Sequence, residues 1–521
     1  MIAYQQIHTL GVPSVSDGLH DILMGNDGIV VLDSTRLLSG DIEIRDGRGL
    51  VLCPGFVDMH SHSDLYRFRS TSEGDALGDV PKLLQGCTFQ VLGQDGYSAA
   101  PVRPDDISDY SQFISGLDGE LESRDWNWST FGEYVTENRK IPGTRTAHLV
   151  GHSTLRRYVS GMADRKLTVR ELQSMTDLLR DSLLNGACGL STGLVYAPAS
   201  FSDEAELFAL ASVLAEFDSV MFVHLRSESY NVMSAAQEVA NACLAAGCRL
   251  HISHIKTAGS DNWRFTPHLI RMLDEMVNER GLRLTADLHP YIAGSTMASV
   301  FLPGWLQSDD NRKTLEMLRS KEHIERARLQ ILEDVTSWDN WWRFSSGWQG
   351  IRFAECHDKS LLGRPLDRVI LENVSADQFS FEAFGWFFGV IADSNLQASI
   401  ISFNNSEDNI APFLRLPYVS LCTDGLINPH GLPHPRTYGA FPRLFRRFQR
   451  ELGVISLEDA VQIASIRGRT VVGNQPINDF VVFNPETFTD ESTFEDPTTP
   501  PTGLATAFIG GQEIMRRNHG E

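Results

Sequence analysis

Two histidines separated by one residue, His60 and His62 in GFVDMHSHSD, form the residue pair from which a reaction site could be built. In a β-strand, residues two apart point to the same face, so both imidazoles can reach one metal ion where the strand ends. Two exposed or hydrogen-bonded histidines would show the same spacing. The pair alone therefore leaves both interpretations open.

Three further residues of metal-ligand type follow strand-like runs: His224 in SVMFVHL, His254 in RLHISHIK and Asp424 in YVSLCTDG. The carboxyl ends of parallel strands in a barrel converge on one mouth, where active sites lie. Asp424 could instead be a helix N-cap, because its neighbours also fit a turn. The whole set favours a metal-dependent active site.

Positioning these residues requires a sheet whose strands all run the same way. Apolar strand-like runs alternate with helix-periodic ones, and parallel neighbours need such crossovers. We therefore predict an α/β fold with a TIM-type (β/α)8 barrel, in preference to a doubly wound sheet. The eight candidate strands are GFVDMH, FQVLGQ, TAHLVGH, ACGLS, MFVHLR, LHISHI, LTADLH and YVSLCTD.

Strand-like segments also occur at both ends of the chain, so a small β-sandwich domain is predicted from the two ends together. A long insertion before the last barrel strand is expected to act as a lid at the barrel rim. Ser456 followed by Asp459 predicts a capping box before a final helix. The predicted parts are 1–54 and 473–521 for the small β domain, 55–302 and 379–472 for the barrel, and 303–378 for the insertion.

Composition limits the partners. The chain has 42% hydrophobic and 21% charged residues, as in packed globular proteins, and a net charge of −22. Phosphate backbones and anionic lipid would repel such a surface, so we expect neither nucleic acid nor membrane as a partner. The seven cysteines are scattered and the start, MIAYQQIHTL, lacks the pattern of a secretory signal, which predicts reduced thiols and a cytoplasmic location. A homo-oligomer is left open.

The ordered motifs PGFVDMHSHSD, FVHLRSE, HISHIKTAG, ADLHPYIAGST and CTDG, with HPRTYGAFPR after it, resemble the amidohydrolase superfamily, in particular the N-acyl-D-amino-acid deacylases or D-aminoacylases. This resemblance implies hydrolysis of the amide bond of a small-molecule N-acyl-D-amino acid, giving a carboxylate and a D-amino acid, with one or two zinc ions as cofactor. Two alternatives remain: another hydrolase of the superfamily acting on a cyclic amide or a dipeptide, and a structural relative without catalysis.

The resemblance also implies roles for the metal-type residues. His60 and His62 would serve one metal position, and His224 and His254 the other. Asp424 would be the catalytic carboxylate and a ligand beside the first position. A carboxylate there can accept a proton from the attacking water and return it to the leaving amine.

One position departs from the pattern. The similar deacylases carry a cysteine, whose thiolate is a metal ligand, where this sequence has Asp95 in GQDG. An aspartate can donate oxygen to zinc, but oxygen is a harder ligand than sulfur and would change metal affinity or number. Asp95 could also be only the first residue of an Asp-Gly turn. In addition, His289 stands where relatives often have tyrosine.

Substrate recognition is expected from five residues, of which Arg436, Tyr196 and Lys256 match pocket positions of the family. Arg436 would bind the α-carboxylate bidentately, although a surface arginine is the plain alternative. Tyr196 and Lys256 would hold carbonyl or carboxylate groups, and Ser295 would donate a hydrogen bond. His152 would line the pocket or make a structural hydrogen bond.

Overall fold

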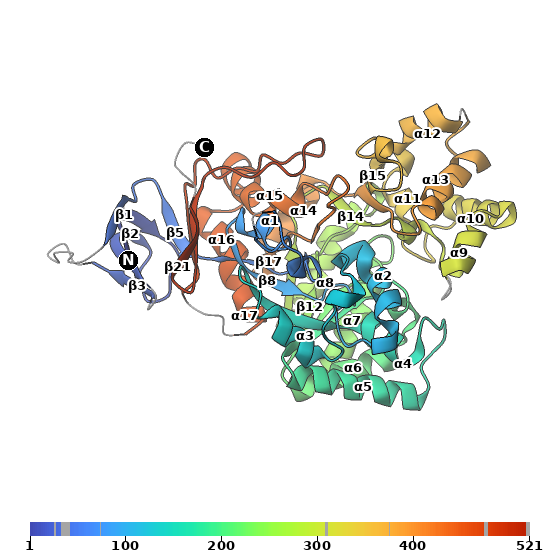
Figure 1. The fold of residues 1–521 in the computed structure, drawn as a ribbon, viewed down its shortest axis with the longest axis horizontal. Helices are drawn as coiled ribbons and strands as arrows, with labels where there is room; N and C mark the ends of the chain where they lie inside the picture. The colour runs from blue at the N-terminus through green and yellow to red at the C-terminus, as the bar shows by residue number, and fades with distance from the viewer. Residues whose placement is uncertain are drawn as a thin grey trace.

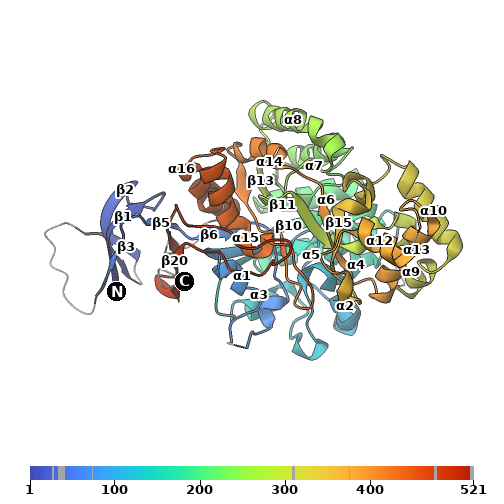
Figure 2. The same ribbon diagram turned by 90° about the horizontal axis from the view of Figure 1, so that it is seen from above.

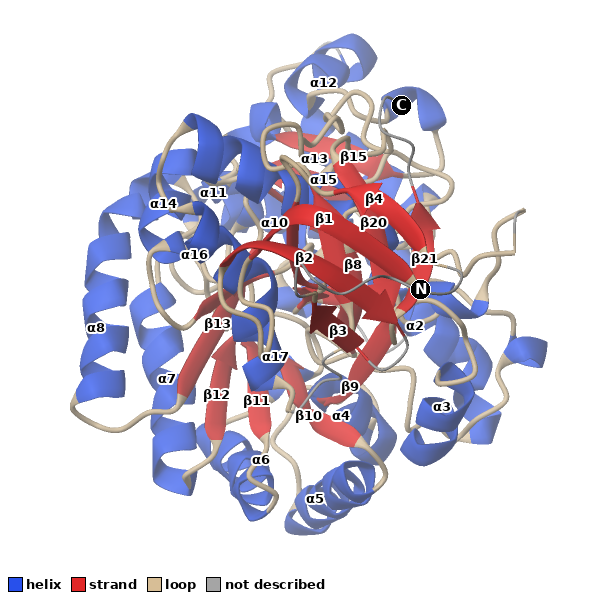
Figure 3. Ribbon diagram, turned by 90° about the vertical axis from the view of Figure 1, so that its left-hand side faces the viewer, coloured by secondary structure: helices blue, strands red, loops and turns tan. Residues whose placement is uncertain are grey.

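The computed structural model describes residues 1–25, 28–32, 42–72, 74–307, 311–374, 376–473 and 478–516. The predicted TIM-type barrel is confirmed: eight parallel strands follow one another around a nearly closed sheet, with helices outside it (Figure 1; Figure 3). All eight strand predictions correspond to barrel strands. In sheet order they are β6 (Phe56–Asp58), β8 (Cys87–Leu92), β9 (Arg145–Gly151), β10 (Ala187–Gly193), β11 (Val220–His224), β12 (Arg249–Ile252), β13 (Leu284–Leu288) and β17 (Val419–Leu421).

Local sequence signals explain where the outer helices begin and end. Thr168 and Glu171 form a capping box at the start of α5 (Val169–Leu184). The predicted capping box of Ser456 and Asp459 is confirmed at the start of α16. Other helices around the barrel are α2 (Ile107–Asp118), α3 (Phe131–Asn138), α4 (His152–Ser160), α6 (Glu204–Glu216), α7 (Val232–Ala246), α8 (Thr266–Asn278), α14 (Glu407–Leu414), α15 (Arg436–Arg443), α16 (Leu457–Val461) and α17 (Arg467–Val471).

The two ends of the chain build one small sheet, which lies at the far left of Figure 1. The link between the ends is antiparallel pairing of β5 with β19. Its apolar core includes Ile7, Ile22 and Val482, all fully buried. The strands are β1 (Ile2–Thr9), β2 (Gly18–Gly25), β3 (Gly28–Val31), β4 (Glu43–Asp46), β5 (Val51–Pro54), β19 (Phe480–Phe483), β20 (Leu504–Ile509) and β21 (Gln512–Arg516).

A third region lies at the opposite end of the molecule from the small sheet, as Figures 1 and 2 both show. Strands β14 (Ala293–Met297), β16 (Ser399–Phe403) and β15 (Ile351–Glu355) form an antiparallel sheet in that order. Strand β16 comes after residue 378, so the excursion from the barrel continues beyond the expected insertion; the domain boundaries stay a prediction. The helices here are α9 (Asn311–Met317), α10 (Lys321–Glu333), α11 (Trp341–Phe344), α12 (Leu366–Val374) and α13 (Phe381–Asp393).

All seven cysteines are free. Within the described ranges, no helix combines the length and the apolar character needed to cross a membrane.

Candidate active site

The six predicted metal-type residues all lie at the carboxyl end of the barrel sheet. Each belongs to the end of a barrel strand or to the two to four residues after it, where parallel strands direct their side chains to a common mouth. None is more than 7% exposed. The structure brings together His60 after β6, His62, Asp95 after β8, His224 at the end of β11, His254 after β12 and Asp424 after β17.

Asp95 occupies the centre of this cluster. Its Oδ1 atom lies 3.5 Å from His60 Nε2 and 3.6 Å from His224 Nδ1. The same oxygen is 3.4 Å from His254 Nε2, and Oδ2 is 3.7 Å from His62 Nε2. Asp95 therefore faces both histidine pairs at once.

The backbone shows that Asp95 is also a turn residue. Asp95 has φ 54° and Gly96 has φ 85°, and Tyr97 N donates a hydrogen bond to Gln94 O over 2.9 Å. Two central residues with positive φ are typical of a tight turn in which Asp and Gly are favoured. The two interpretations of Asp95 are therefore compatible, because the turn aims its carboxylate at the histidines.

Two other site residues share this uncommon backbone, His254 with φ 33° and Asp424 with φ 46°. Buried hydrogen bonds hold both. Asp287 Oδ1 accepts from His254 N over 2.7 Å, and Asp424 N donates to His60 O over 2.9 Å. Such conformations persist only where the surroundings fix them, and they cluster at functional sites.

Asp424 faces the first histidine pair with one oxygen and an arginine with the other. Its Oδ1 lies 3.6 Å from His62 Nε2 and 3.9 Å from His60 Nε2. Its Oδ2 lies 2.8 Å from Arg436 Nη1. Burial raises the pKa of Asp424, but Arg436 and the histidines more than offset this and hold it below its usual value. The carboxylate is thus ionised at neutral pH, as a proton acceptor must be.

Two carboxylates that were not singled out from the sequence contact the histidines at the ring nitrogens that point away from Asp95. Asp118 Oδ1 lies 2.9 Å from His62 Nδ1. Glu228 Oε1 lies 2.9 Å from His254 Nδ1, and its Oε2 lies 3.7 Å from His224 Nε2. In each case the other ring nitrogen faces Asp95, which is how an outer carboxylate orients a metal-binding imidazole.

Glu228 was recognisable in the motif FVHLRSE, where it follows His224 by four residues. Its position depends on the distant Asp339, whose carboxylate accepts from Glu228 N over 2.7 Å. Ser227 and Ser229 also donate to Asp339, each over 2.6 Å. The third region thus reaches the loop beside the second histidine pair. No local sequence pattern predicts the contact between Glu228 and Asp339, because the two residues are far apart in sequence.

The charges of the cluster favour a cation. Burial lowers the pKa of His62, but Asp118 and Asp95 overcome this and raise it to about 10. Burial and Lys256 likewise lower the pKa of His254, while Glu228 and Asp95 raise it to about 10. The carboxylates therefore favour positive charge at both pairs, and a metal ion competes with protons for the same nitrogens.

Unpartnered polar atoms fit a metal ion as well. Among the described residues, Asp95 Oδ1 and both ring nitrogens of His224 are buried without a hydrogen-bond partner. Such groups are costly in a protein interior unless a ligand or ion satisfies them. The structure offers three overlapping sets with ligand atoms within 4.8 Å: His60, Asp95 and His254; His60, His62 and Asp424; and His224, Glu228 and His254.

Four of the predicted substrate residues line the cavity beside the metal-type cluster: Tyr196, Lys256, Ser295 and Arg436. Lys256 Nζ donates to Glu228 Oε1 over 2.6 Å, and Arg436 Nη2 donates to Ser295 O over 3.1 Å. Within the described part of the chain, Ser295 Oγ and Arg436 Nε have no partner. These two atoms are free to contact a bound molecule.

His152 lies outside this cavity lining and uses both ring nitrogens elsewhere. Nδ1 is 2.9 Å from Thr192 Oγ1, and Nε2 is 2.8 Å from Glu206 Oε1. These bonds match the structural alternative given for this residue. His289, in contrast, is buried 3.8 Å from Asp424 Oδ2, and its two ring nitrogens lack a partner among the described residues.

Comparisons with known proteins agree with this geometry. A family model described as the amidohydrolase family matches residues 43–332. The D-aminoacylase of Alcaligenes xylosoxydans xylosoxydans is 27% identical over 482 residues, 90% of this chain and 85% of that protein. The N-acyl-D-aspartate deacylase of the same organism is 27% identical over 505 residues, 95% of this chain and 88% of that protein.

Solved structures show the same fold. A D-aminoacylase crystal structure is 25% identical with a TM-score of 0.76, covering 99% of this chain and 96% of that one. The N-acyl-D-glutamate deacylase of Bordetella bronchiseptica, complexed with zinc and a phosphonate inhibitor, is 24% identical with a TM-score of 0.77. The alignment with this deacylase covers 100% of the present chain and 97% of the deacylase chain.

Proposed function

The chain belongs to the amidohydrolase family and is a hydrolase of linear amide bonds, and we propose that its substrates are N-acyl-D-amino acids. The products would be a carboxylate and the free D-amino acid. The observation that carries this proposal is the arrangement at the barrel mouth: the two histidine pairs converge on Asp95, and Asp424 faces the first pair. Relatives named as D-amino-acid deacylases match nine-tenths or more of the chain, which supports the substrate class.

We propose that the cofactor is zinc, with one or two ions. His60, His62 and Asp424 would hold one ion, His224 and His254 the other, and Asp95 would lie between them. Imidazole and carboxylate donors suit zinc. Such an ion, when bound, polarises the scissile carbonyl and lowers the pKa of water.

In this proposal Asp424 moves the proton. Its ionised carboxylate accepts a proton from the attacking water at Oδ1, the oxygen that faces His60 and His62. The same group then returns that proton to the nitrogen of the leaving amine. Arg436 holds the other oxygen at 2.8 Å, so the carboxylate keeps one orientation through both transfers.

Recognition of the substrate would use groups around the same cavity. Arg436 supplies positive charge and an unpartnered Nε for the α-carboxylate while Nη1 keeps its contact with Asp424. Ser295 Oγ offers a further hydrogen-bond donor. Both lie close to Lys256 in the cavity wall.

The test is a comparison of N-acetyl-D- with N-acetyl-L-amino acids, followed by release of the free amino acid. We expect hydrolysis of the D series alone, and we expect α-carboxamide analogues of the same substrates to be poor because they lack the charge that Arg436 would bind. Equal rates for L substrates or for the carboxamides would contradict the proposal.

A further inference from the structure

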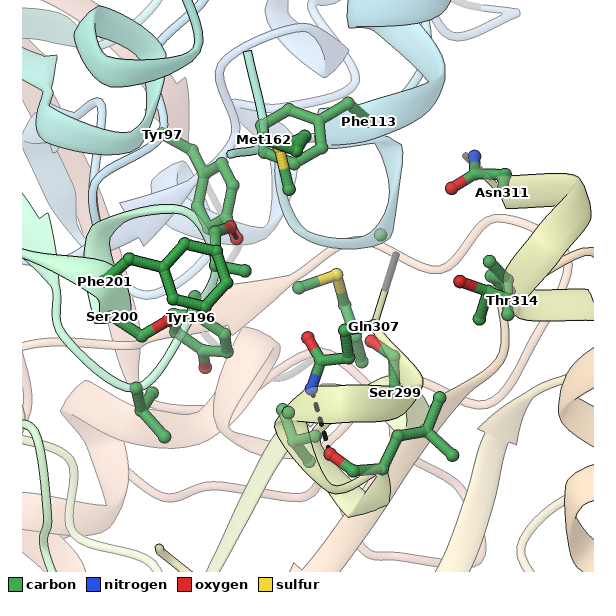
Figure 4. A pocket seen from close by; sticks show the side chains of 18 of the residues that line it. Tyr97, Phe113, Met162, Tyr196, Ser200, Phe201, Ser299, Gln307, Asn311 and Thr314 are labelled. Atoms are coloured by element: carbon green, nitrogen blue, oxygen red, sulfur yellow. Dashed lines mark hydrogen bonds between the residues drawn. The ribbon is translucent and has the colours of Figure 1, made fainter. Parts of the chain in front are cut away.

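A second, larger cavity shares Tyr196 with the cavity of the candidate active site. Figure 4 shows residues that line it. It measures about 360 Å³, within the range of small-molecule pockets. It lies between the loop after β10, helix α2 and the start of the third region. Its wall is more apolar than polar: uncharged polar side chains such as Gln307, Asn311 and Thr314 lie among apolar ones, which include Tyr97, Phe113, Met162, Leu194, Phe201 and Val300.

Tyr196 is the shared wall of the two cavities. Its ring lies edge-on to His224 with centroids 5.2 Å apart, and its hydroxyl is 3.0 Å from Thr296 Oγ1. Thr296 lines the smaller cavity and the adjacent Met297 lines the larger one. The two cavities therefore adjoin at Tyr196, on the His224 side of the metal-type cluster.

The barrel order shows which part of a substrate points there. Tyr196 follows β10, whereas Asp424 follows β17 and contacts Arg436, the first residue of α15. In the order of eight strands, β10 and β17 are four places apart, so they lie on opposite sides of the mouth. If Arg436 binds the α-carboxylate and the amide lies over the cluster, the acyl group would point toward β10.

The charges in the cavity wall agree with an apolar occupant. Arg226 donates to Glu238 Oε2 over 3.0 Å and to Ser200 O over 2.8 Å. The Asp339 carboxylate accepts hydrogen bonds from the hydroxyls of Ser227 and Ser229 and from Glu228 N. These are the two charged side chains of the cavity lining in the described ranges, and each already has protein partners.

We propose that this apolar cavity binds the N-acyl group, and that the enzyme prefers extended hydrocarbon acyl chains to acetyl. The inference rests on the proposed function, because it uses the amide and the carboxylate to orient the substrate. The apolar wall and the volume point to a linear or aromatic acyl group several carbons long. Each methylene that enters the cavity should raise kcat/KM about fourfold until the space is filled.

The experiment measures kcat/KM for two matched series. The first varies the acyl group of D-leucine from acetyl through butanoyl to hexanoyl. The second keeps acetyl and lengthens an unbranched side chain from D-alanine to D-norvaline and D-norleucine. We expect a rise of more than tenfold from acetyl to butanoyl in the first series and a smaller change in the second.

A substitution in the cavity wall tests whether the effect of acyl-chain length on kcat/KM arises there. Val195 lies in the cavity wall and is half-buried, so Val195→Phe fills space there. It should lower kcat/KM for the hexanoyl substrate at least tenfold more than for the acetyl substrate, and Val195→Ala should not. Val169→Phe is the matched control, because Val169 is 88% exposed on α5. It should leave the ratio of the two substrates unchanged.

The outcomes separate the two proposals. Turnover of N-acetyl-D-leucine with no gain from longer acyl groups would overturn the assignment of the cavity and leave the proposed function standing. A gain in the side-chain series alone, abolished by Val195→Phe, would assign the cavity to the side chain and overturn the acyl assignment. Hydrolysis of none of the substrates would overturn both.

Discussion

The two histidine pairs of the site are supported in different ways. His60 and His62 come from one short segment, and Asp118 at the end of α2 orients one of them. His224 and His254 come from different strands, and a single carboxylate, Glu228, faces both. Glu228 in turn depends on Asp339 from outside the barrel. The histidines of the first position are thus close in sequence and are supported from a helix around the barrel, whereas the second position depends on docking of a distant region.

The largest expected effect distinguishes the carboxylate that moves the proton from those that hold metal. Asp424→Asn should lower kcat 100-fold or more, the scale of a lost general acid and base, while most of the zinc stays bound to the histidines. Kinetics and metal analysis of the same sample check this. Asp408→Asn, at an exposed position on α14, is the control. A variant that keeps a tenth of the activity would assign the proton transfer elsewhere.

Asp95 faces both pairs, so its variants test whether the two positions share a ligand. Asp95→Ala should reduce zinc affinity at least 10 to 100-fold, because loss of a group that only hydrogen-bonds to a metal ligand already costs that much. Zinc should then leave on mild chelation. Asp95→Cys should retain zinc, because a thiolate is a good zinc ligand.

Asp95→Asn preserves the turn and serves as the control for backbone shape. Unchanged zinc content in the alanine, cysteine and asparagine variants alike would mean that Asp95 only shapes the turn.

Comparing Glu228→Gln with Asp118→Asn tests whether each histidine pair is supported by its own carboxylate. Loss of an orienting carboxylate should weaken metal binding by about 10 to 100-fold at the pair it supports. Glu228→Gln should therefore affect the His224 and His254 position, and Asp118→Asn the His60 and His62 position. Stepwise chelation followed by metal analysis separates the two. Equal loss at both positions from either variant would show that the pairs are not independently supported.

The smallest expected effect is that of Asp339→Asn. This change weakens the hydrogen bonds to Ser227, Ser229 and Glu228 N without touching a histidine. Zinc affinity at the second position should fall by less than tenfold, because Glu228 keeps its own carboxylate. The first position should be unaffected. A loss as large as that of Glu228→Gln would mean that Asp339 alone keeps Glu228 in place.

The same contrast explains what could be predicted from the sequence. The barrel strands and the capping box at Ser456 were predictable, because apolar runs and caps are local signals. The convergence of the metal-type residues followed from the rule that parallel strand ends share one mouth. Asp118 and Asp339 were not predictable, because each acts through a tertiary contact with no spacing pattern. The contact of Arg436 with Asp424 was missed for the same reason.

The most direct test of the account is the metal content of the purified protein. The histidines, Asp95 and Asp424 are interpreted as the donors of a zinc site, so elemental analysis after zinc supplementation and extensive dialysis should find one or two equivalents per chain. His254→Ala, prepared in parallel, should contain less. A protein that folds normally but retains no zinc after this treatment would contradict the central claim.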